Sequence, residues 1–225
     1  MILKKGEISV KSYENINYNL YLITDRDVLN GRDFLKSLEQ GILGGVSVVQ
    51  LREKNTNSLE FYNLAIEVKK LTEKYNIPLI INDRVDIALA VDSDGVHVGQ
   101  TDLPANIVRK IIGKNKILGV STANLEEAKK AVDDGADYIG VGALFPTVTK
   151  TNTRKVTLDQ LKYIKENTNI PIVGIGGINE INVRSVIETG VDGAAIASAI
   201  LSKTNIKETA ESLYNEIQLS FKNRR

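Results

Sequence analysis

The sequence predicts an α/β fold, a single-domain (β/α)₈ barrel. Short β-branched apolar runs alternate with longer amphipathic stretches along most of the chain, which is typical of repeated strand–helix units. The 225 residues, 42% hydrophobic and 25% charged, are enough for one large core. Eight such units follow one another with no linker or low-complexity tract between them, as a closed barrel requires.

The expected strands are short apolar runs bounded by turn residues, as in parallel sheets that are covered on both faces. They are Leu20–Thr24, Val46–Arg52, Leu79–Asn82, Gly95–Val98, Ile117–Ser121, Tyr138–Val141, Ile172–Ile175 and Gly193–Ile196. A doubly wound open sheet is the alternative. It is disfavoured because no Gly-x-Gly-x-x-Gly turn follows the first strand and no second domain is visible.

Helical patterns separate these strands. They are expected at Asp33–Leu43, Ser58–Tyr75, Leu125–Asp133, Leu158–Glu166, Ile181–Glu188 and Lys207–Phe221, with weaker patterns at Val85–Val91 and Ala105–Ile112. Gly41, Gly135 and Gly190 are expected at helix C-termini, where a left-handed residue ends the helix. Residues 1–17 are expected to form an N-terminal arm, which leaves 18–225 for the catalytic barrel.

Composition excludes several classes of function. The formal net charge of +1 gives no reason to expect nucleic acid or a membrane surface as partner, so anion binding must be local. With no cysteine, disulfides, thiolate metal sites and cysteine nucleophiles are excluded. No apolar stretch is long enough for a signal peptide or a membrane span, so a cytoplasmic protein is expected. The oligomeric state stays open, a homo-oligomer included.

Two carboxylates follow adjacent expected strands and predict a metal site. Asp83 ends the run Ile80–Asp83, and Asp102 ends Gly95–Asp102. Because neighbouring strands lie about 4.8 Å apart, acids just beyond their carboxyl ends can share a hard cation such as Mg²⁺. The alternative is that both are helix N-caps.

A cationic group follows the second expected strand. Alternation along Gln50–Lys54 places Gln50, Arg52 and Lys54 on one side, where a guanidinium fork and an ammonium could bind phosphate oxygens. The alternative is that Arg52 and Glu53 form a solvated ion pair at the rim, which contributes little.

The remaining candidates follow strands six to eight. The segment from Gly142 to Lys155 is longer than an ordinary connection and rich in hydroxyls, as expected of a flap over a phosphorylated ligand or of a surface excursion. Gly174–Ile178 and Ala194–Ser198 occupy positions where barrels commonly bind a phosphate through backbone N–H groups. Two anion sites on one barrel mouth favour two phosphorylated substrates, one of which loses pyrophosphate.

Together these motifs resemble the thiamine-phosphate synthase family. The resemblance runs from about Tyr21 to Leu201 in family order and rests on Gln50–Lys54, Ile81–Asp83, Gly95–Asp102, Gly119–Ser121, Phe145–Lys150 and Gly174–Ile178. It implies a Mg²⁺-dependent alkyl transferase. Such an enzyme joins 4-amino-2-methyl-5-hydroxymethylpyrimidine diphosphate to a methylthiazole ethyl phosphate, often carboxylated, and releases thiamine phosphate and pyrophosphate.

The resemblance also implies residue roles. Asp83 and Asp102 would hold magnesium, and Arg52, Lys54, Ser121 and Lys150 would act in catalysis. The pyrimidine diphosphate would contact Gln50, Leu51, Arg52, Glu53, Lys54, Asn82, Ser121 and Lys150, and the thiazole phosphate Thr147, Thr149, Gly177, Ala197 and Ser198. In the family the diphosphate leaves first, and the thiazole nitrogen captures the resulting pyrimidine cation, so that no protein nucleophile is needed.

One departure and two rival functions accompany this resemblance. Many relatives carry His where this chain has Ala123, and its single histidine, His97, is expected to be a structural residue inside the fourth strand. A thiazole tautomerase of the same barrel family is the nearest rival enzyme, although it generally lacks the full metal and diphosphate set. A non-catalytic barrel that binds a phosphorylated metabolite is the rival from another class.

Overall fold

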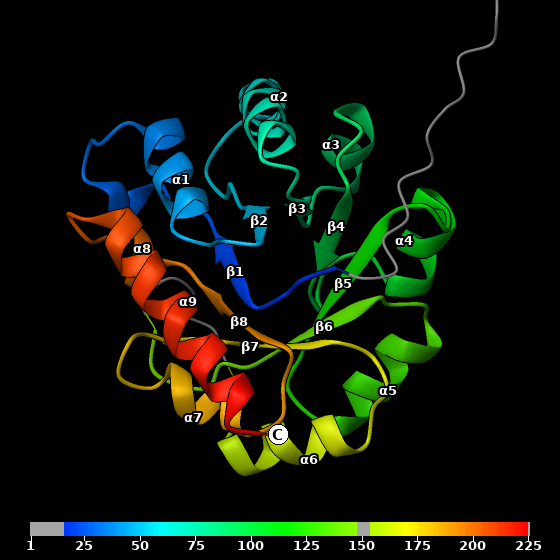
Figure 1. Cartoon of the computed structure of the whole chain (residues 1–225). Coiled ribbons are helices and arrows are strands. Elements are labelled where there is room, and N and C mark those ends of the chain that lie inside the picture. Colours follow the sequence, from blue (N-terminus) through cyan, green and yellow to red (C-terminus); the bar gives the residue numbers. More distant parts are fainter. Residues whose placement is uncertain (1–15, 148–153, 225) are drawn as a thin grey trace, which may run out of the picture.

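The computed structural model describes residues 16–147 and 154–224 as a closed parallel barrel inside a ring of helices (Figure 1). Within those residues eight strands pair in sequence order, and the last strand pairs with the first. The (β/α)₈ fold class is therefore confirmed. The doubly wound alternative is wrong because pairing of the first and last strands leaves the barrel without an open edge.

The strands are β1 (Leu20–Ile23), β2 (Val48–Leu51), β3 (Leu79–Asn82), β4 (Gly95–Val98), β5 (Ile117–Thr122), β6 (Tyr138–Val141), β7 (Ile172–Ile175) and β8 (Gly193–Ile196). The helices are η1 (Asp27–Leu29), α1 (Phe34–Leu43), α2 (Ser58–Lys74), α3 (Val85–Ala90), α4 (Ala105–Ile112), α5 (Leu125–Asp133), α6 (Leu158–Glu166), α7 (Val183–Glu188), α8 (Ser198–Leu201) and α9 (Ile206–Lys222). The expected elements are present with small shifts at their ends. The sequence does not predict η1 and α8, because elements this short carry no periodic pattern.

Strand alternation divides the buried side chains into two layers. In β1, Leu20 and Leu22 pack against the helices, whereas Tyr21 and Ile23 point into the barrel. In β2 the inward positions are Val48 and Gln50. The barrel interior is therefore filled by a small cluster that contains three tyrosines, and its polar groups come from inward strand positions.

Side-chain caps start several helices where the sequence supplies Asp, Asn or Thr. The Asp33 carboxylate accepts the Lys36 N–H at 2.8 Å, and Thr157 and Gln160 form a capping box at the start of α6. At the other ends, Gly135 and Gly190 have φ of 89° and 103°, as expected. Gly41 is a correction, because it lies inside α1, where an added Cβ would lie 3.1 Å from Leu22 Cδ2.

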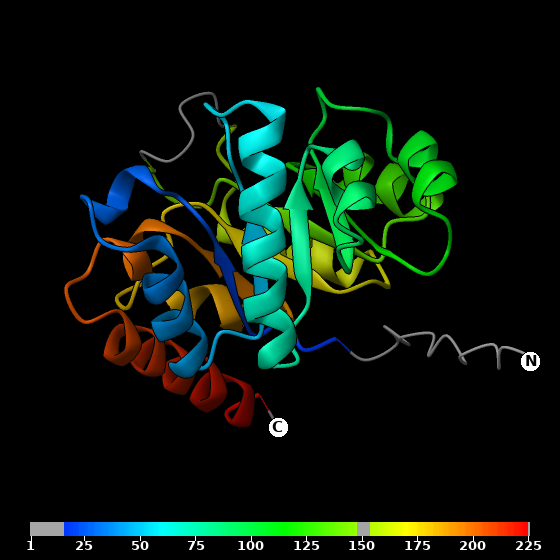
Figure 2. The same ribbon diagram turned by 90° about the horizontal axis from the view of Figure 1, so that it is seen from above.

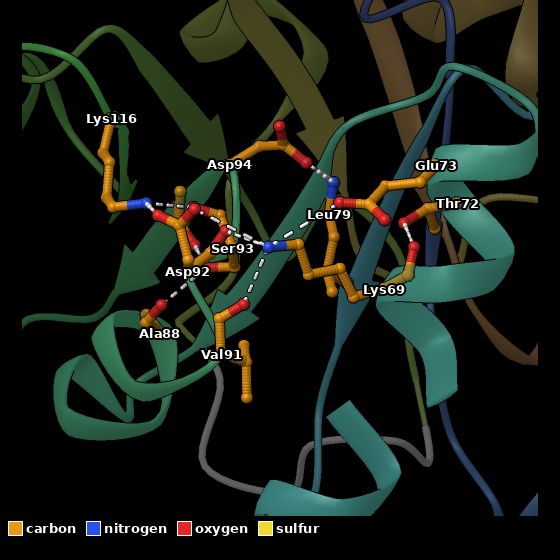
Figure 3. Close-up of polar contacts among 11 residues, drawn as sticks. Lys69, Thr72, Glu73, Leu79, Ala88, Val91, Asp92, Ser93, Asp94 and Lys116 are labelled. Carbon is orange, nitrogen blue, oxygen red and sulfur yellow. Dashed lines mark hydrogen bonds and ion pairs between the residues drawn. The ribbon is translucent and has the colours of Figure 1, made fainter. Parts of the chain in front are cut away.

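The amino-terminal ends of neighbouring strands are tied together by side chains. Backbone N–H groups at the starts of β3, β5 and β7 donate to carboxylates that lie just before β4, β6 and β8. The pairs are Leu79 to Asp94, Leu118 to Asp137 and Ile172 to Asp192. Figure 3 shows the first of these beside Lys69 and Lys116, which bind the loop between α3 and β4. These contacts connect neighbouring strands at the amino-terminal end of the barrel, opposite the carboxyl ends of the strands.

Long helices cover the outside of the barrel. Figure 2 shows α2 and α9 lying along the outer surface, and α9 packs against α1 and α7, which closes the helical ring. No helix in the described part of the chain is both long enough and apolar enough to span a bilayer. Of the expected N-terminal arm, residues 1–15 lie outside the described residues.

Candidate active site

The carboxyl ends of the strands surround a cavity of about 610 Å³. Each strand contributes to its wall, from Ile23 of β1 round to Ala195 of β8. The sequence-predicted site residues that line it are Gln50, Arg52, Lys54, Asn82, Asp83, Asp102, Ser121, Thr147, Gly177, Ala197 and Ser198. Candidates from both expected anion sites therefore share one cavity.

Two of the described candidates, Leu51 and Glu53, do not line the cavity, and two further candidates are not described. Leu51 is fully buried in the layer between sheet and helices, and Glu53 forms an ion pair with Arg26 at 3.1 Å. Thr149 and Lys150 lie outside the described residues, as do all of residues 148–153 of the expected flap. Because Arg26 pairs with Glu53, the alternative of an Arg52–Glu53 ion pair is wrong. Burial raises the pKa of Glu53 above its ordinary value.

A tight turn presents Asp83 to the cavity. Asp83 has a φ of 61°, and its N–H donates to the His97 carbonyl at 2.8 Å, which holds this left-handed residue between β3 and β4. Its carboxylate forms an ion pair with Lys54. The N-cap of α3 is Arg84, so Asp83 is not the cap. Left-handed backbone at a non-glycine residue is costly and is often found at functional sites.

Asp102 completes an acidic pair with Asp83. Its Oδ2 accepts the Gly99 N–H at 2.7 Å, which folds the loop after β4 back on itself, and the N-cap of α4 is Pro104. The alternative that both acids are helix N-caps is therefore wrong. Burial and the nearby Asp83 carboxylate raise the pKa of Asp102. A carboxylate pair that repels in this way is suited to a cation.

The available side-chain ligands limit which metal ion could bind here. Within residues 16–147 and 154–224, no group of three or more His, Cys, Asp or Glu side chains could hold a metal ion. A pair of carboxylates nevertheless fits Mg²⁺, which is commonly bound through one or two carboxylates together with water and substrate phosphates. It does not fit a structural zinc site, which needs four protein ligands.

The floor of the cavity is polar. Gln50 and His97 are 3% and 5% exposed, and with Ser121 they line the deep end. Both ring nitrogens of His97 are hydrogen-bonded. Nδ1 lies 2.9 Å from the Tyr138 hydroxyl, and Nε2 lies 2.8 Å from Ser121 Oγ. This buried, hydrogen-bonded ring agrees with the expected structural role, although it also faces the cavity.

The opposite arc is built from backbone and hydroxyls. Gly177 has a φ of 63°, and a Cβ there would collide with the backbone of Phe145 and Pro146. Thr147, Gly177 and Ser198 also line an adjoining cavity of about 340 Å³. Glycine at 177 is thus required by the packing of two loops, independently of any ligand.

Sequence reasoning missed a charged pair in the wall. Arg154 Nη2 donates to Glu127 Oε2 at 2.8 Å, and the same oxygen accepts the Ala123 N–H at 2.9 Å. Both Arg154 and Glu127 line the cavity, as does Gln100. The Gly-Gln-Thr-Asp run gave a signal for Gln100, but Glu127 lies inside a helical pattern and gave none.

Comparison with known proteins identifies close relatives. The family model described as thiamine monophosphate synthase matches residues 20–200. A thiamine-phosphate synthase of Alkaliphilus oremlandii is 70% identical over 93% of this chain and all of its own length. One from Clostridium tetani is 60% identical over 89% of this chain and 96% of its own length.

Solved structures lead to the same group of proteins. Thiamine phosphate pyrophosphorylase from Pyrococcus furiosus superposes with a TM-score of 0.84 and 38% identity, over 91% of this chain and 98% of that chain. The enzyme of that name from Bacteroides thetaiotaomicron has a TM-score of 0.65 at 18% identity, covers 89% of this chain and 98% of that chain, and shows the fold alone.

Proposed function

The chain belongs to the thiamine monophosphate synthase family and is a transferase, and from this premise we propose its substrates. They are 4-amino-2-methyl-5-hydroxymethylpyrimidine diphosphate and a methylthiazole ethyl phosphate, plain or carboxylated, which give thiamine phosphate and pyrophosphate, and also CO2 when the thiazole is carboxylated. One observation carries the proposal: a single cavity collects a cationic and acidic arc on β2 to β4 and a backbone and hydroxyl arc on β6 to β8. Two phosphorylated molecules can meet there.

The depth of the cavity supports the orientation of the pyrimidine diphosphate. Uncharged Gln50 and Ser121 lie at the floor and suit a polar aromatic ring, whereas Arg52 and Lys54 lie nearer the mouth and suit a diphosphate. Asn82, which also lines the cavity, would contact the same substrate. Lys150, outside the described residues, is proposed for this substrate through the family resemblance alone.

The other arc would receive the thiazole phosphate. Thr147, Gly177, Ala197 and Ser198 surround it, and small residues with hydroxyls allow an anion to approach backbone N–H groups. Thr149 belongs to this group through the resemblance. Facing arcs would hold the thiazole nitrogen near the methylene carbon of the pyrimidine, which lowers the entropic cost of the encounter.

Asp83 and Asp102 would hold magnesium. Held by these carboxylates, the ion would supply Lewis-acid chemistry that neutralises charge on the diphosphate. Lys54, which pairs with Asp83 in the structure, would then be close enough to the same phosphates to bind them. Arg52, also in the wall, would add a second fixed positive charge.

The proposed reaction is a dissociative displacement. The bond between the methylene carbon and the bridging oxygen breaks, and its electron pair leaves with pyrophosphate. The thiazole nitrogen lone pair then forms the new carbon–nitrogen bond to the pyrimidine cation. Arg52 and Lys54 would stabilise the charge that develops on pyrophosphate, and Gln50 and Ser121 would hold the ring in place. The absence of cysteine is consistent with a route that needs no protein nucleophile.

Pyrophosphate release tests the proposal. The purified protein is incubated with magnesium and both substrates, and then with each substrate omitted in turn. Pyrophosphate and thiamine phosphate in equal amounts, only when both are present, are the expected result. Conversion of the thiazole phosphate without the pyrimidine would instead indicate a tautomerase. Binding without any product would indicate a non-catalytic barrel.

A further inference from the structure

A continuous hydrogen-bonded chain crosses the barrel interior beneath the cavity. Gln50 Nε2 donates to the Tyr21 hydroxyl at 2.8 Å, and the Tyr21 and Tyr138 hydroxyls are 2.7 Å apart. Tyr138 reaches His97 Nδ1 at 2.9 Å, and His97 Nε2 reaches Ser121 Oγ at 2.8 Å. The chain joins two groups that line the cavity floor, Gln50 and Ser121, through side chains of β1, β6 and β4.

Counting protons gives this chain a direction. Tyr21 accepts from Gln50, so its own proton is best used toward Tyr138, and the Tyr138 proton is then used toward His97 Nδ1. In this order a neutral imidazole would carry its proton on Nε2 and donate it to Ser121 Oγ, which lies 2.8 Å away. If His97 were protonated on Nδ1, one of the two phenol protons would have no partner within the chain. Buried donors left unpaired are costly, which favours the head-to-tail order.

We propose that Tyr138 is a positioning residue that acts through His97 and makes the Ser121 hydroxyl face the substrate as a donor, while Tyr21 orients Gln50 at the other end of the chain. With Oγ already accepting from His97, the Ser121 proton is free to donate into the cavity. With Nε2 held by Tyr21, the Gln50 carboxamide oxygen is turned toward the ligand as an acceptor. The floor therefore presents a donor and an acceptor at opposite sides, complementary to a ring nitrogen and an exocyclic amine. This inference rests on the proposed function, whose aminopyrimidine has both groups.

Neighbouring residues hold the hydrogen-bonded chain of side chains in place. Tyr138 is fully buried, and its ring packs against Tyr18 with centroids 4.8 Å apart. A Cβ at Gly119 would collide with both Tyr138 and His97, so glycine at this inward position of β5 provides the space that the contact needs. Burial raises the pKa of both Tyr21 and Tyr138, which keeps both phenols protonated as the chain requires.

Calorimetric titration with the pyrimidine diphosphate, at saturating magnesium and without thiazole, tests this role. Tyr138→Phe removes the hydroxyl and frees His97 to take the other tautomer, after which Ser121 would donate to His97 and no longer to the ligand. We expect Kd to rise about five- to tenfold, the size of one neutral hydrogen bond. In a Ser121→Ala background the same change should cost much less than in the wild type, because only the Tyr138 contact with Gln50 remains to be lost. Kd for the thiazole phosphate should not move.

Two further variants separate positioning from packing. Tyr18→Phe is the matched control, because Tyr18 is buried in the same cluster but its hydroxyl is not part of the chain, and its Kd should equal that of the wild type. Tyr21→Phe removes one of the two phenol hydroxyls that Gln50 contacts and leaves the links from Tyr138 to Ser121 in place, so its loss should persist in the Ser121→Ala background. A deamino analogue of the pyrimidine should bind Tyr21→Phe and the wild type equally.

The outcomes are distinct. An unchanged Kd in Tyr138→Phe, or a loss that adds fully to that of Ser121→Ala, would overturn the inference. If Tyr138→Phe fails to fold, His97→Gln breaks the chain at the next link and must show the same coupling to Ser121→Ala. If the wild type releases pyrophosphate while these couplings are absent, only the inference fails. If the wild type releases none, the proposed function itself fails.

Discussion

The two carboxylates at the mouth of the barrel lie close together, and of the two only Asp83 forms an ion pair within the described residues. Lys54 neutralises Asp83, whereas Asp102 holds a backbone N–H and has a raised pKa. Such an arrangement stores repulsion that a divalent cation would relieve. The cost of keeping both acids there is a reason to assign them a function and not a stabilising role.

Replacing either acid by its amide tests the proposed magnesium site. Asp83→Asn and Asp102→Asn remove charge with little change in volume, so turnover at limiting magnesium should fall more than about tenfold. Because the like-charge pair is removed, thermal unfolding without magnesium should occur at the same or a higher temperature in Asp102→Asn. Pyrophosphate release across a magnesium titration and calorimetric melting measure the two effects. Wild-type turnover at low magnesium in either variant would contradict the assignment.

At the scale of elements, the two ends of the barrel are built differently. Carboxylates before alternate strands bind the N–H groups of their neighbours at the amino-terminal end, and Asp192 shows the arrangement clearly. Its Oδ2 accepts the Ile172 N–H at 2.8 Å and pairs with Lys165 of α6 at 2.7 Å. One side chain thus connects β7, β8 and a helix, far from the cavity residues.

Asp192→Ala should therefore cost stability and leave ligand binding unchanged. The free energy of unfolding should fall by about 1–3 kcal/mol, because a backbone N–H loses a charged acceptor. Kd for the pyrimidine diphosphate should stay at the wild-type value. Denaturant unfolding and calorimetry measure the two quantities, and Asp159→Ala, an exposed acid at the start of α6, is the control. A weakened ligand in Asp192→Ala would show that the two ends of the barrel are coupled.

At the scale of the whole molecule, periodicity was sufficient to predict the barrel, because each strand and helix carries its own local pattern. Strand alternation likewise predicted that Gln50, Arg52 and Lys54 share one side, and all three line the cavity. Contacts between distant strands were beyond such reasoning. Tyr21 and Tyr138 are 117 residues apart, and their hydroxyls meet only because closure of the barrel sets which inward positions face each other.

The division of the mouth into two arcs gives the most direct test of a two-substrate enzyme. Arg52→Ala should weaken the pyrimidine diphosphate about tenfold or more, because a charged hydrogen bond is lost, and leave the thiazole phosphate nearly unchanged. Ser198→Ala should do the reverse by a few-fold, since only a neutral hydroxyl is removed.

Gly177 is less suitable for this comparison, because a methyl group at its left-handed backbone would displace the loop at Phe145 and Pro146 whether or not a ligand binds there. Gly177→Ala should therefore lower the melting temperature, whereas Ser198→Ala should not. Titrating Arg52→Ala and Ser198→Ala with each substrate separately decides the question. If both variants lose the same ligand, the cavity has one phosphate site. The acidic and cationic arc would then have no diphosphate of its own to bind.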